Sequence, residues 1–162
     1  MIKKINVLFL LTLFFCLSVK SQDNIKNYVS FLSVEEPPIY PGCEGDKTEL
    51  KDCFNKKVQK VLVKNFDSDI LFDLNLKPGR HKAYIVFTVN TIGKIENIKV
   101  KASHKAIKNE CIRAVKRIPK MFPGLSKSKK VRVQYITPLF LSVGETYKQR
   151  KKRSKQEKKR RN

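Results

Sequence analysis

Two cysteines, Cys43 and Cys53, lie ten positions apart and are the first residues of this sequence whose types and spacing suggest chemistry. Such a pair can serve as a metal site, a redox pair or a structural disulfide. Zinc ligands usually recur two to four residues apart and a redox pair usually has the CxxC spacing, and this pair has neither. In an oxidising compartment it would form a disulfide, and closing a loop of this length stabilises a fold by roughly 3 kcal/mol. We therefore predict a Cys43–Cys53 disulfide, provided that the chain is exported.

The first 21 residues have the form of a cleavable signal peptide. A basic start is followed by an apolar run at 5–19 and by small residues that end at Ser21. A retained anchor is the alternative, but this run is shorter than the about 20 apolar residues that cross a bilayer. Phe15 is too bulky for the position before the cysteine of a lipoprotein processing site, so Cys16 does not indicate an acyl anchor. We expect cleavage after Ser21 and a periplasmic or secreted protein.

The remaining reactive side chains form no catalytic motif. His81 and His104 are the two histidines, and neither stands in a recognisable pattern. Cys111 lies on an apolar stripe of a predicted helix, where a small buried hydrophobe is the usual interpretation. There is no glycine-rich phosphate loop. We therefore predict no catalytic residue, no metal site and no cofactor, and a secreted enzyme is the function with the least support.

The basic charge is concentrated at the C-terminal end. The formal net charge is +22, and residues 147–162 hold ten Lys or Arg against one Glu. This tail has no apolar residue beyond Tyr147, so it cannot bury surface and is predicted to be disordered. Export makes an anionic lipid or polysaccharide its possible contact, and a merely solvated tail is the alternative. Nucleic acid is not expected, because Tyr84 and Phe87 point to opposite faces of one strand and cannot form one stacking platform.

Two helices are predicted from apolar spacing and capping residues. Asp46 followed by Glu49 makes a capping box, and the apolar positions after it recur at helical spacing over 47–65. A second apolar stripe follows Ser103, a candidate cap, and Pro119 ends that helix. We expect both helices to pack on a sheet.

Three strands are predicted from alternation. Residues 81–90 and 97–102 alternate in hydrophobicity and are joined by a turn that contains Gly93, which indicates a hairpin. A third strand covers 130–143. Because Pro138 has no N–H to donate, this strand should lie at a sheet edge or be broken at that residue.

These elements predict an α+β fold, a three-stranded antiparallel sheet with two helices packed on one face. The expected organisation is a signal peptide at 1–21, a lead-in segment at 22–36, one domain at 37–146 and the disordered basic tail at 147–162. The length after the leader suits one compact domain.

Four stretches of the sequence resemble the TonB C-terminal domain family, in the version found in secreted or periplasmic members of the Bacteroidetes type. They are PPIYPGCEG at 37–45, AYIVFTVNTIGKIENIKV at 83–100, RIPKMFPG at 117–124 and VRVQYITPLFLSV at 131–143. One departure is Asn65-Phe66-Asp67, which stands where the family usually has a Tyr-Pro pair. A second is that only 15 residues separate the leader from Pro37, so the membrane helix and Pro-rich span of a complete energy transducer are not expected.

The resemblance implies a non-catalytic binding domain in TonB-dependent transport across the outer membrane. Family members use the third strand to capture the N-terminal peptide of an outer-membrane receptor or transporter by strand addition. An envelope-attached structural or interaction module, whose basic tail binds anionic surfaces, is the alternative. The positions that match the peptide-binding edge strand are Val131, Arg132, Val133, Gln134, Tyr135 and Ile136.

Overall fold

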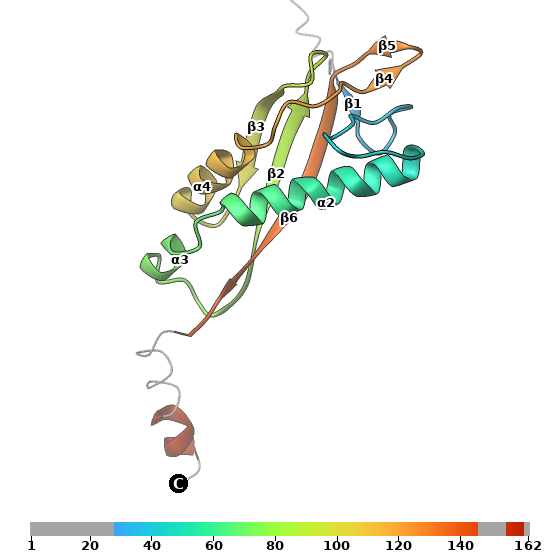
Figure 1. Cartoon of the computed structure of the whole chain (residues 1–162). Coiled ribbons are helices and arrows are strands. Elements are labelled where there is room, and N and C mark those ends of the chain that lie inside the picture. The colour runs from blue at the N-terminus through green and yellow to red at the C-terminus, as the bar shows by residue number, and fades with distance from the viewer. Residues whose placement is uncertain (1–27, 146–154, 161–162) are drawn as a thin grey trace, which may run out of the picture.

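A computed structural model of the chain describes residues 28–145 and 155–160 (Figure 1). Its centre is a four-stranded sheet with the strand order β1-β6-β2-β3, in which β1 runs parallel to β6 and the other neighbours are antiparallel. The fold is therefore α+β with a mixed sheet, whereas three antiparallel strands were predicted. The strands of this sheet are β1 (Val29–Ser30), β2 (Gly79–Val89), β3 (Ile95–Lys101) and β6 (Val133–Val143). A separate short hairpin joins β4 (Leu125–Ser126) to β5 (Lys129–Lys130).

The two long strands form the centre of the sheet. β2 pairs with β6 without a break from Gly79 opposite Val143 to Val89 opposite Val133. In β6 every second side chain from Val133 to Leu141 is buried, and in β2 the same alternation holds from Ala83 to Phe87, which is the pattern that predicted the strands. Thr88 departs from it, because it is buried between Phe87 and Val89. Phe87 is fully buried and Tyr84 is 48% exposed, so the prediction that these two rings lie on opposite faces is confirmed.

The hairpin between β2 and β3 turns at residues 90–93. The side chain of Asn90 accepts hydrogen bonds from the backbone N–H groups of Ile92 and Lys94. Gly93 has a φ of 81°, which a residue with a side chain rarely adopts. The predicted hairpin is confirmed, with β2 starting two residues earlier than expected.

The first helix is confirmed at its predicted bounds. α2 spans Lys47–Asn65, and both halves of the capping box between Asp46 and Glu49 are present. α4 spans Lys105–Val115, and its cap is His104 rather than the predicted Ser103. The ring of His104 accepts a hydrogen bond from the Ala106 N–H at 3.2 Å, so it caps the helix in place of the Ser103 hydroxyl.

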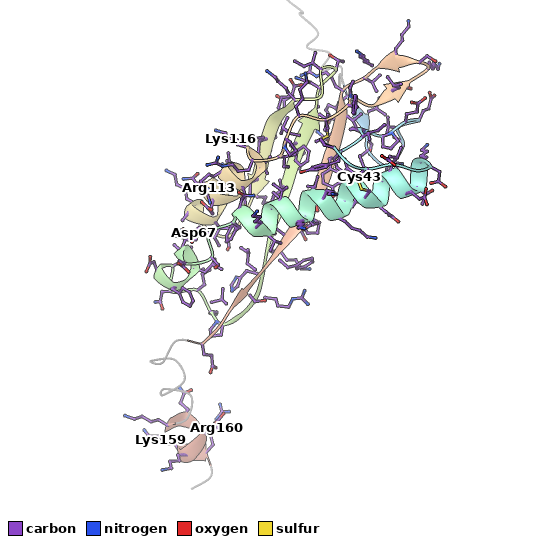
Figure 2. All side chains as sticks on the ribbon, in the orientation of Figure 1. Cys43, Asp67, Arg113, Lys116, Lys159 and Arg160 are labelled. Carbon is purple, nitrogen blue, oxygen red and sulfur yellow. A yellow bond between two sulfur atoms is a disulfide. The ribbon has the colours of Figure 1, made fainter. Side chains whose placement is uncertain are left out.

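A four-residue helix, α3 (Ile70–Asp73), was not predicted, because its stretch has no apolar period. It lies beside α4 in Figure 1. Glu110 of α4 accepts a hydrogen bond from the backbone N–H of Asp67, and Arg113 donates to the carbonyl of Asn65. Figure 2 labels Asp67 and Arg113 close to this junction. Side chains of α4 thus position the chain between α2 and α3.

α2 and α4 cover one face of the sheet, as predicted, and the core lies between the two layers (Figure 1). The opposite face carries exposed side chains, among them Tyr84 and Ile136. The largest fully buried side chains include Phe54, Phe87, Leu62, Ile85, Ile107 and Leu139.

The predicted disulfide is present between Cys43 and Cys53, whose Cα atoms are 5.8 Å apart. It ties the loop before α2 to the second turn of that helix, and Figure 2 places Cys43 against α2. The loop that carries Pro41 is therefore held to the helix by a covalent bond.

Two predicted segments differ from the structure. Residues 28–36, predicted as a lead-in before the domain, contain β1 and the buried side chains Phe31 and Val34, so they are part of the domain. Residues 155–160 of the basic tail form an exposed helix, which differs from the disorder predicted there. Lys, Arg, Gln and Glu are good helix formers, so this stretch can form a helix although it has no apolar residue.

The predicted signal peptide, residues 1–21, lies outside the described residues. Within the described residues no helix combines the length and hydropathy that crossing a membrane requires.

Candidate functional site: the open edge of β6

β6 is paired along its whole length on one side and at its start on the other. Every residue of β6 has a pairing partner on β2. On the outer side β1 pairs with Val133 and Gln134 and then leaves the sheet. From Ile136 to Ser142 no strand of the described chain lies along the outer side, so the edge is open there.

The hydrogen bonds to β1 show which backbone groups face this edge. The carbonyl oxygens of Arg132 and Gln134 accept from the N–H groups of Val29 and Phe31 at 2.7 and 2.9 Å. Backbone groups alternate in direction along a strand, and the register with β2 is unbroken, so every second residue of β6 turns its N–H and C=O outward. Beyond β1 the outward-facing residues are Ile136, Pro138, Phe140 and Ser142.

Pro138 lies on the outward-facing side of this alternation. Its missing N–H therefore removes no bond to β2, and the strand continues through it. Its carbonyl accepts a hydrogen bond from the Gln59 amide of α2 at 3.2 Å, and the same amide donates to the Thr137 hydroxyl at 2.6 Å. The third strand was predicted to lie at a sheet edge or to be broken at Pro138. In the strand order β6 lies between β1 and β2 and is unbroken, but at Pro138 its outer side has no neighbouring strand in the described residues.

β1 stops after two residues because the chain turns into the core. The Ser30 carbonyl accepts from the N–H groups of Ser33 and Val34, which closes a turn. Phe31 then packs its ring 4.6 Å from that of Phe54 and 5.0 Å from that of Tyr135. These aromatic contacts fix where β1 ends and therefore where the open edge begins.

A hollow of about 250 Å³ lies where β1 leaves the sheet. Leu32 and Ile136, which are 84% and 60% exposed, flank it, and Asn55 of α2 also lines it. The Tyr135 hydroxyl donates to Asn55 Oδ1 at 2.8 Å, and burial raises the pKa of Tyr135, so this hydroxyl keeps its proton. The Asn55 side-chain N–H groups have no acceptor within the described residues and can donate to a ligand in the hollow.

Further along the edge the surface is apolar and basic. Phe140 is 48% exposed, and the charged groups of Arg80 and Lys82 lie 5.0 and 5.4 Å from its ring centre. Such cation–π contacts hold two positive charges beside the edge.

The structure places the six predicted edge residues differently along β6. Val131 and Arg132 precede the strand: the Val131 N–H donates to Gly124, and the Arg132 side chain forms an ion pair with Glu96. Val133 and Gln134 are covered by β1, and the Tyr135 side chain is buried.

Ile136 is the predicted residue with which the open edge begins. Phe140, Ser142 and Asn55 were not predicted as site residues. The period-two alternation of 133–143 was a signal for the first two. The position of Asn55 depends on how α2 crosses the sheet, which the sequence does not indicate.

The other reactive groups have local structural roles. His81 Nε2 lies 2.7 Å from the carbonyl oxygen of Lys77, and His104 caps α4. Burial, with the charge of Glu110, raises the pKa of Cys111 to about 11, so this thiol is protonated at neutral pH. Within the described residues no three His, Cys, Asp or Glu side chains gather as metal ligands do. The absence of catalysis stays a prediction.

Comparison with known proteins shows a similarity to a solved structure. No family model matches the chain, and no curated protein matches it. The solution structure of the TonB C-terminal domain of Helicobacter pylori (residues 179–285) is similar, with a TM-score of 0.43 and 21% sequence identity. The similarity covers 64% of this chain and 99% of that one.

Proposed function

We propose that this chain is a non-catalytic domain that captures an extended peptide by strand addition at the open edge of β6. The observation that carries the proposal is the outward-facing backbone of Ile136, Phe140 and Ser142, which has no strand partner in the described residues. An extended peptide would pair with these groups as a fifth strand. The hollow beside Asn55 would take one of its side chains, because alternate side chains of an added strand point to the same face.

The proposed partner is the N-terminal segment of an outer-membrane receptor or transporter, and the proposed setting is TonB-dependent transport. The sequence resemblance to the TonB C-terminal domain family, in its Bacteroidetes-type secreted or periplasmic version, supports this assignment. The Cys43–Cys53 disulfide supports an oxidising compartment. The intact mass of the protein from the cell envelope tests export: it should lack residues 1–21 and be lighter than the reduced chain by two hydrogen atoms.

The test of strand addition compares two substitutions at one residue. Peptides from the N-termini of outer-membrane transporters of the same organism are titrated into the isotope-labelled protein, and amide shifts are followed. We expect shifts at Ile136, Phe140 and Ser142. Ile136→Pro removes an outward N–H and leaves the bonds to β2, so it should weaken binding about tenfold, which is one hydrogen bond of about 1.4 kcal/mol.

Ile136→Val is the control, because it keeps both the N–H and a β-branched side chain. It should bind as the unchanged protein does. Equal affinities of the Pro and Val variants, or shifts confined to β3, would refute strand addition at β6.

The exposed basic helix of residues 155–160 favours a second candidate, attachment to an anionic surface of the envelope. Figure 2 shows Lys159 and Arg160 on this helix. Binding to vesicles that contain anionic lipid should weaken as salt rises and disappear when residues 147–162 are deleted. Peptide binding at β6 should survive the same deletion, so the two functions can be separated.

A further inference from the structure

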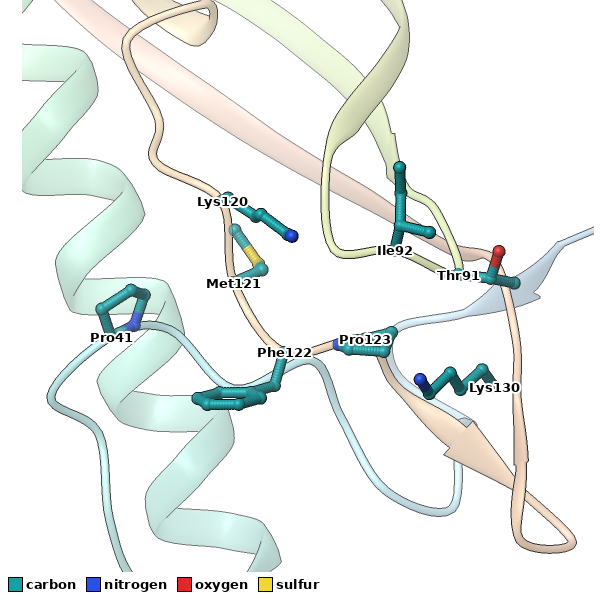
Figure 3. A pocket seen from close by; sticks show the side chains of 8 residues that line it. All are labelled: Pro41, Thr91, Ile92, Lys120, Met121, Phe122, Pro123 and Lys130. Carbon is teal, nitrogen blue, oxygen red and sulfur yellow. The ribbon is translucent and has the colours of Figure 1, made fainter.

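A second surface, separate from the edge of β6, has the properties of a docking site. It is a groove of about 510 Å³ between the hairpin turn at 90–93 and the segment 120–123, with Pro41 and Lys130 at its sides (Figure 3). None of the residues that line it belongs to β6 or to the hollow beside Asn55. The inference therefore does not depend on the proposed function.

The groove exposes large apolar side chains. Phe122 is 67% exposed and Ile92 is 56% exposed, while Met121, between them in Figure 3, is 4% exposed. Pro41 and Pro123 add further apolar surface. Exposed apolar side chains that share one groove are more informative than scattered ones, because such patches commonly mark interaction sites.

The backbone under these side chains is fixed on both sides. The Met121 N–H donates to the Gly93 carbonyl at 3.0 Å, and a Cβ at Gly93 would lie 1.7 Å from the Met121 carbonyl oxygen. Phe122 and Ile39 exchange two backbone hydrogen bonds of 3.0 and 3.2 Å. The Cys43–Cys53 disulfide anchors the loop that carries Pro41. A ligand would therefore meet apolar groups on a backbone that is already ordered, which lowers the entropic cost of binding.

The charges around the groove have one sign. Lys120 extends toward Ile92, and Lys130 lies on the side of Thr91 and Pro123 (Figure 3). Both lysines are exposed, and no acidic side chain lines the groove in the described part of the chain. A ligand with an apolar group and negative charges would complement this surface.

We propose that this groove docks an acidic peptide segment of a partner protein, in which one large apolar side chain is flanked by carboxylates. The apolar side chain would pack against Phe122 and Ile92, and the carboxylates would pair with Lys120 and Lys130. A protein segment fits better than a small molecule, because walls as exposed as Phe122 and Ile92 cannot enclose one. A second copy of this chain is a poor occupant, because its net charge of +22 opposes self-association.

The experiment uses the full chain and three synthetic peptides with blocked ends. The probe has one phenylalanine between two pairs of aspartates. One control peptide has alanine in place of phenylalanine, and the other has lysines in place of the aspartates. We expect the probe to shift the methyl signals of Ile92 and Met121 in NMR spectra, with about tenfold weaker binding for the alanine peptide and no binding for the lysine peptide.

Variants test the two parts of the groove. Lys120→Glu and Lys130→Glu should each weaken binding of the probe about fivefold, and Phe122→Ser should weaken it about tenfold. Lys56→Glu and Lys60→Glu reverse exposed charges on α2, and Phe72→Ser changes a side chain that is 72% exposed elsewhere. These three controls should leave the affinity unchanged, and circular dichroism should show that every variant keeps its fold.

Three results would overturn the proposal. The first is a probe that binds as well after both Lys120 and Lys130 are reversed. The second is a set of shifts on β6 with none at Ile92 or Met121. The third is a dependence of the Ile92 signal on protein concentration without any peptide, which would assign the groove to a second copy.

Discussion

The two edges of the sheet, β3 and the outer side of β6, differ in how well they resist an added strand. On β3, Lys99 and Lys101 are exposed, Asn97 has a φ of 52°, and the pairing with β2 shifts between Val86 and Thr88. Charged side chains and register irregularities are the features by which natural sheets discourage edge pairing.

β6 beyond Gln134 has none of this irregularity. Its register with β2 is regular, and its outward side chains include the exposed apolar residues Ile136 and Phe140. Pro138 is the one residue there that discourages pairing by its chemistry. The comparison shows that lying at an edge does not make a strand available to a partner. Regular pairing and the absence of charged side chains decide whether an edge can accept an added strand, and both favour β6.

The largest expected effect on stability tests whether the ring of Phe31 fixes where β1 ends and the open edge of β6 begins. Phe31→Ala removes a ring that packs on Phe54 and Tyr135, and we expect it to lower the free energy of unfolding by about 4 kcal/mol. It should also release β1, so the amides of Val29 and Phe31 should exchange faster with solvent. Urea denaturation and hydrogen exchange measure the two effects. Continued protection of those amides would show that β1 is held without the ring.

The next effect tests the direction of the backbone along β6. Thr137→Pro removes an N–H that faces β2 and leaves a carbonyl of β2 without its donor, so it should cost about 3 kcal/mol. Ile136→Pro, one residue earlier, removes an N–H that faces outward and should cost less than about 1 kcal/mol. Thermal unfolding of both variants measures the difference. Equal losses would contradict the assigned alternation.

A smaller effect concerns α4, which packs on the β3 side. Hydrogen bonds from Arg113 and from the Asp67 N–H hold the pKa of Glu110 below its ordinary value of 4.5. The stability that these bonds supply is complete above the ordinary pKa and is lost as the pH falls through the lower, folded-state pKa. Glu110→Gln should therefore cost about 1–2 kcal/mol at neutral pH and nothing below the folded-state pKa.

Unfolding free energies measured from pH 7 to pH 2 test this prediction, with Glu44→Gln on an exposed residue as the control. Hydrogen exchange should quicken more in α4 and β3 than in β6, because α4 packs on the sheet mainly through β3 and β2. A cost that does not change with pH would mean that the carboxylate charge of Glu110 contributes nothing.

The smallest effect on stability tests the protection of β3. Lys99→Ala and Lys101→Ala change exposed side chains and should alter the free energy of unfolding by less than about 0.5 kcal/mol. If the lysines guard this edge, the double variant should associate with itself at high concentration, which sedimentation measures. A double variant that stays monomeric would show that the irregularity at Asn97 protects β3 by itself.

Local patterns in the sequence were enough to predict several elements. Asp46 and Glu49 define the start of α2 because capping depends on neighbours within one turn. The buried residues of β6 alternate from Val133 to Leu141, those of β2 alternate from Ala83 to Phe87, and the spacing of Cys43 and Cys53 suits a disulfide. Each of these signals depends on residues that are close in sequence.

What the sequence did not indicate depends on long-range packing. β1 is two residues long and is held by Phe31 against rings from α2 and β6, so no local period reveals it. The predicted site began at Val131 because it followed the resemblance to the TonB C-terminal domain family. The covering of Val133 and Gln134 by β1 has no local sequence signal. His104 replaced Ser103 as the cap because the chain enters α4 one residue later than the hydroxyl suggested. The groove at Phe122 joins four separate segments and has no sequence signature of its own.

Pro138 and Gln59 together have a consequence for which chains β6 can accept. One site in the middle of the edge has no donor, and its acceptor is already taken by a side chain of α2. A guest strand needs no main-chain partner at that point. A proline or an N-methylated residue of the guest strand opposite Pro138 would lose no backbone hydrogen bond. β6 can therefore pair with sequences that would leave an unsatisfied hydrogen-bonding group in most sheets.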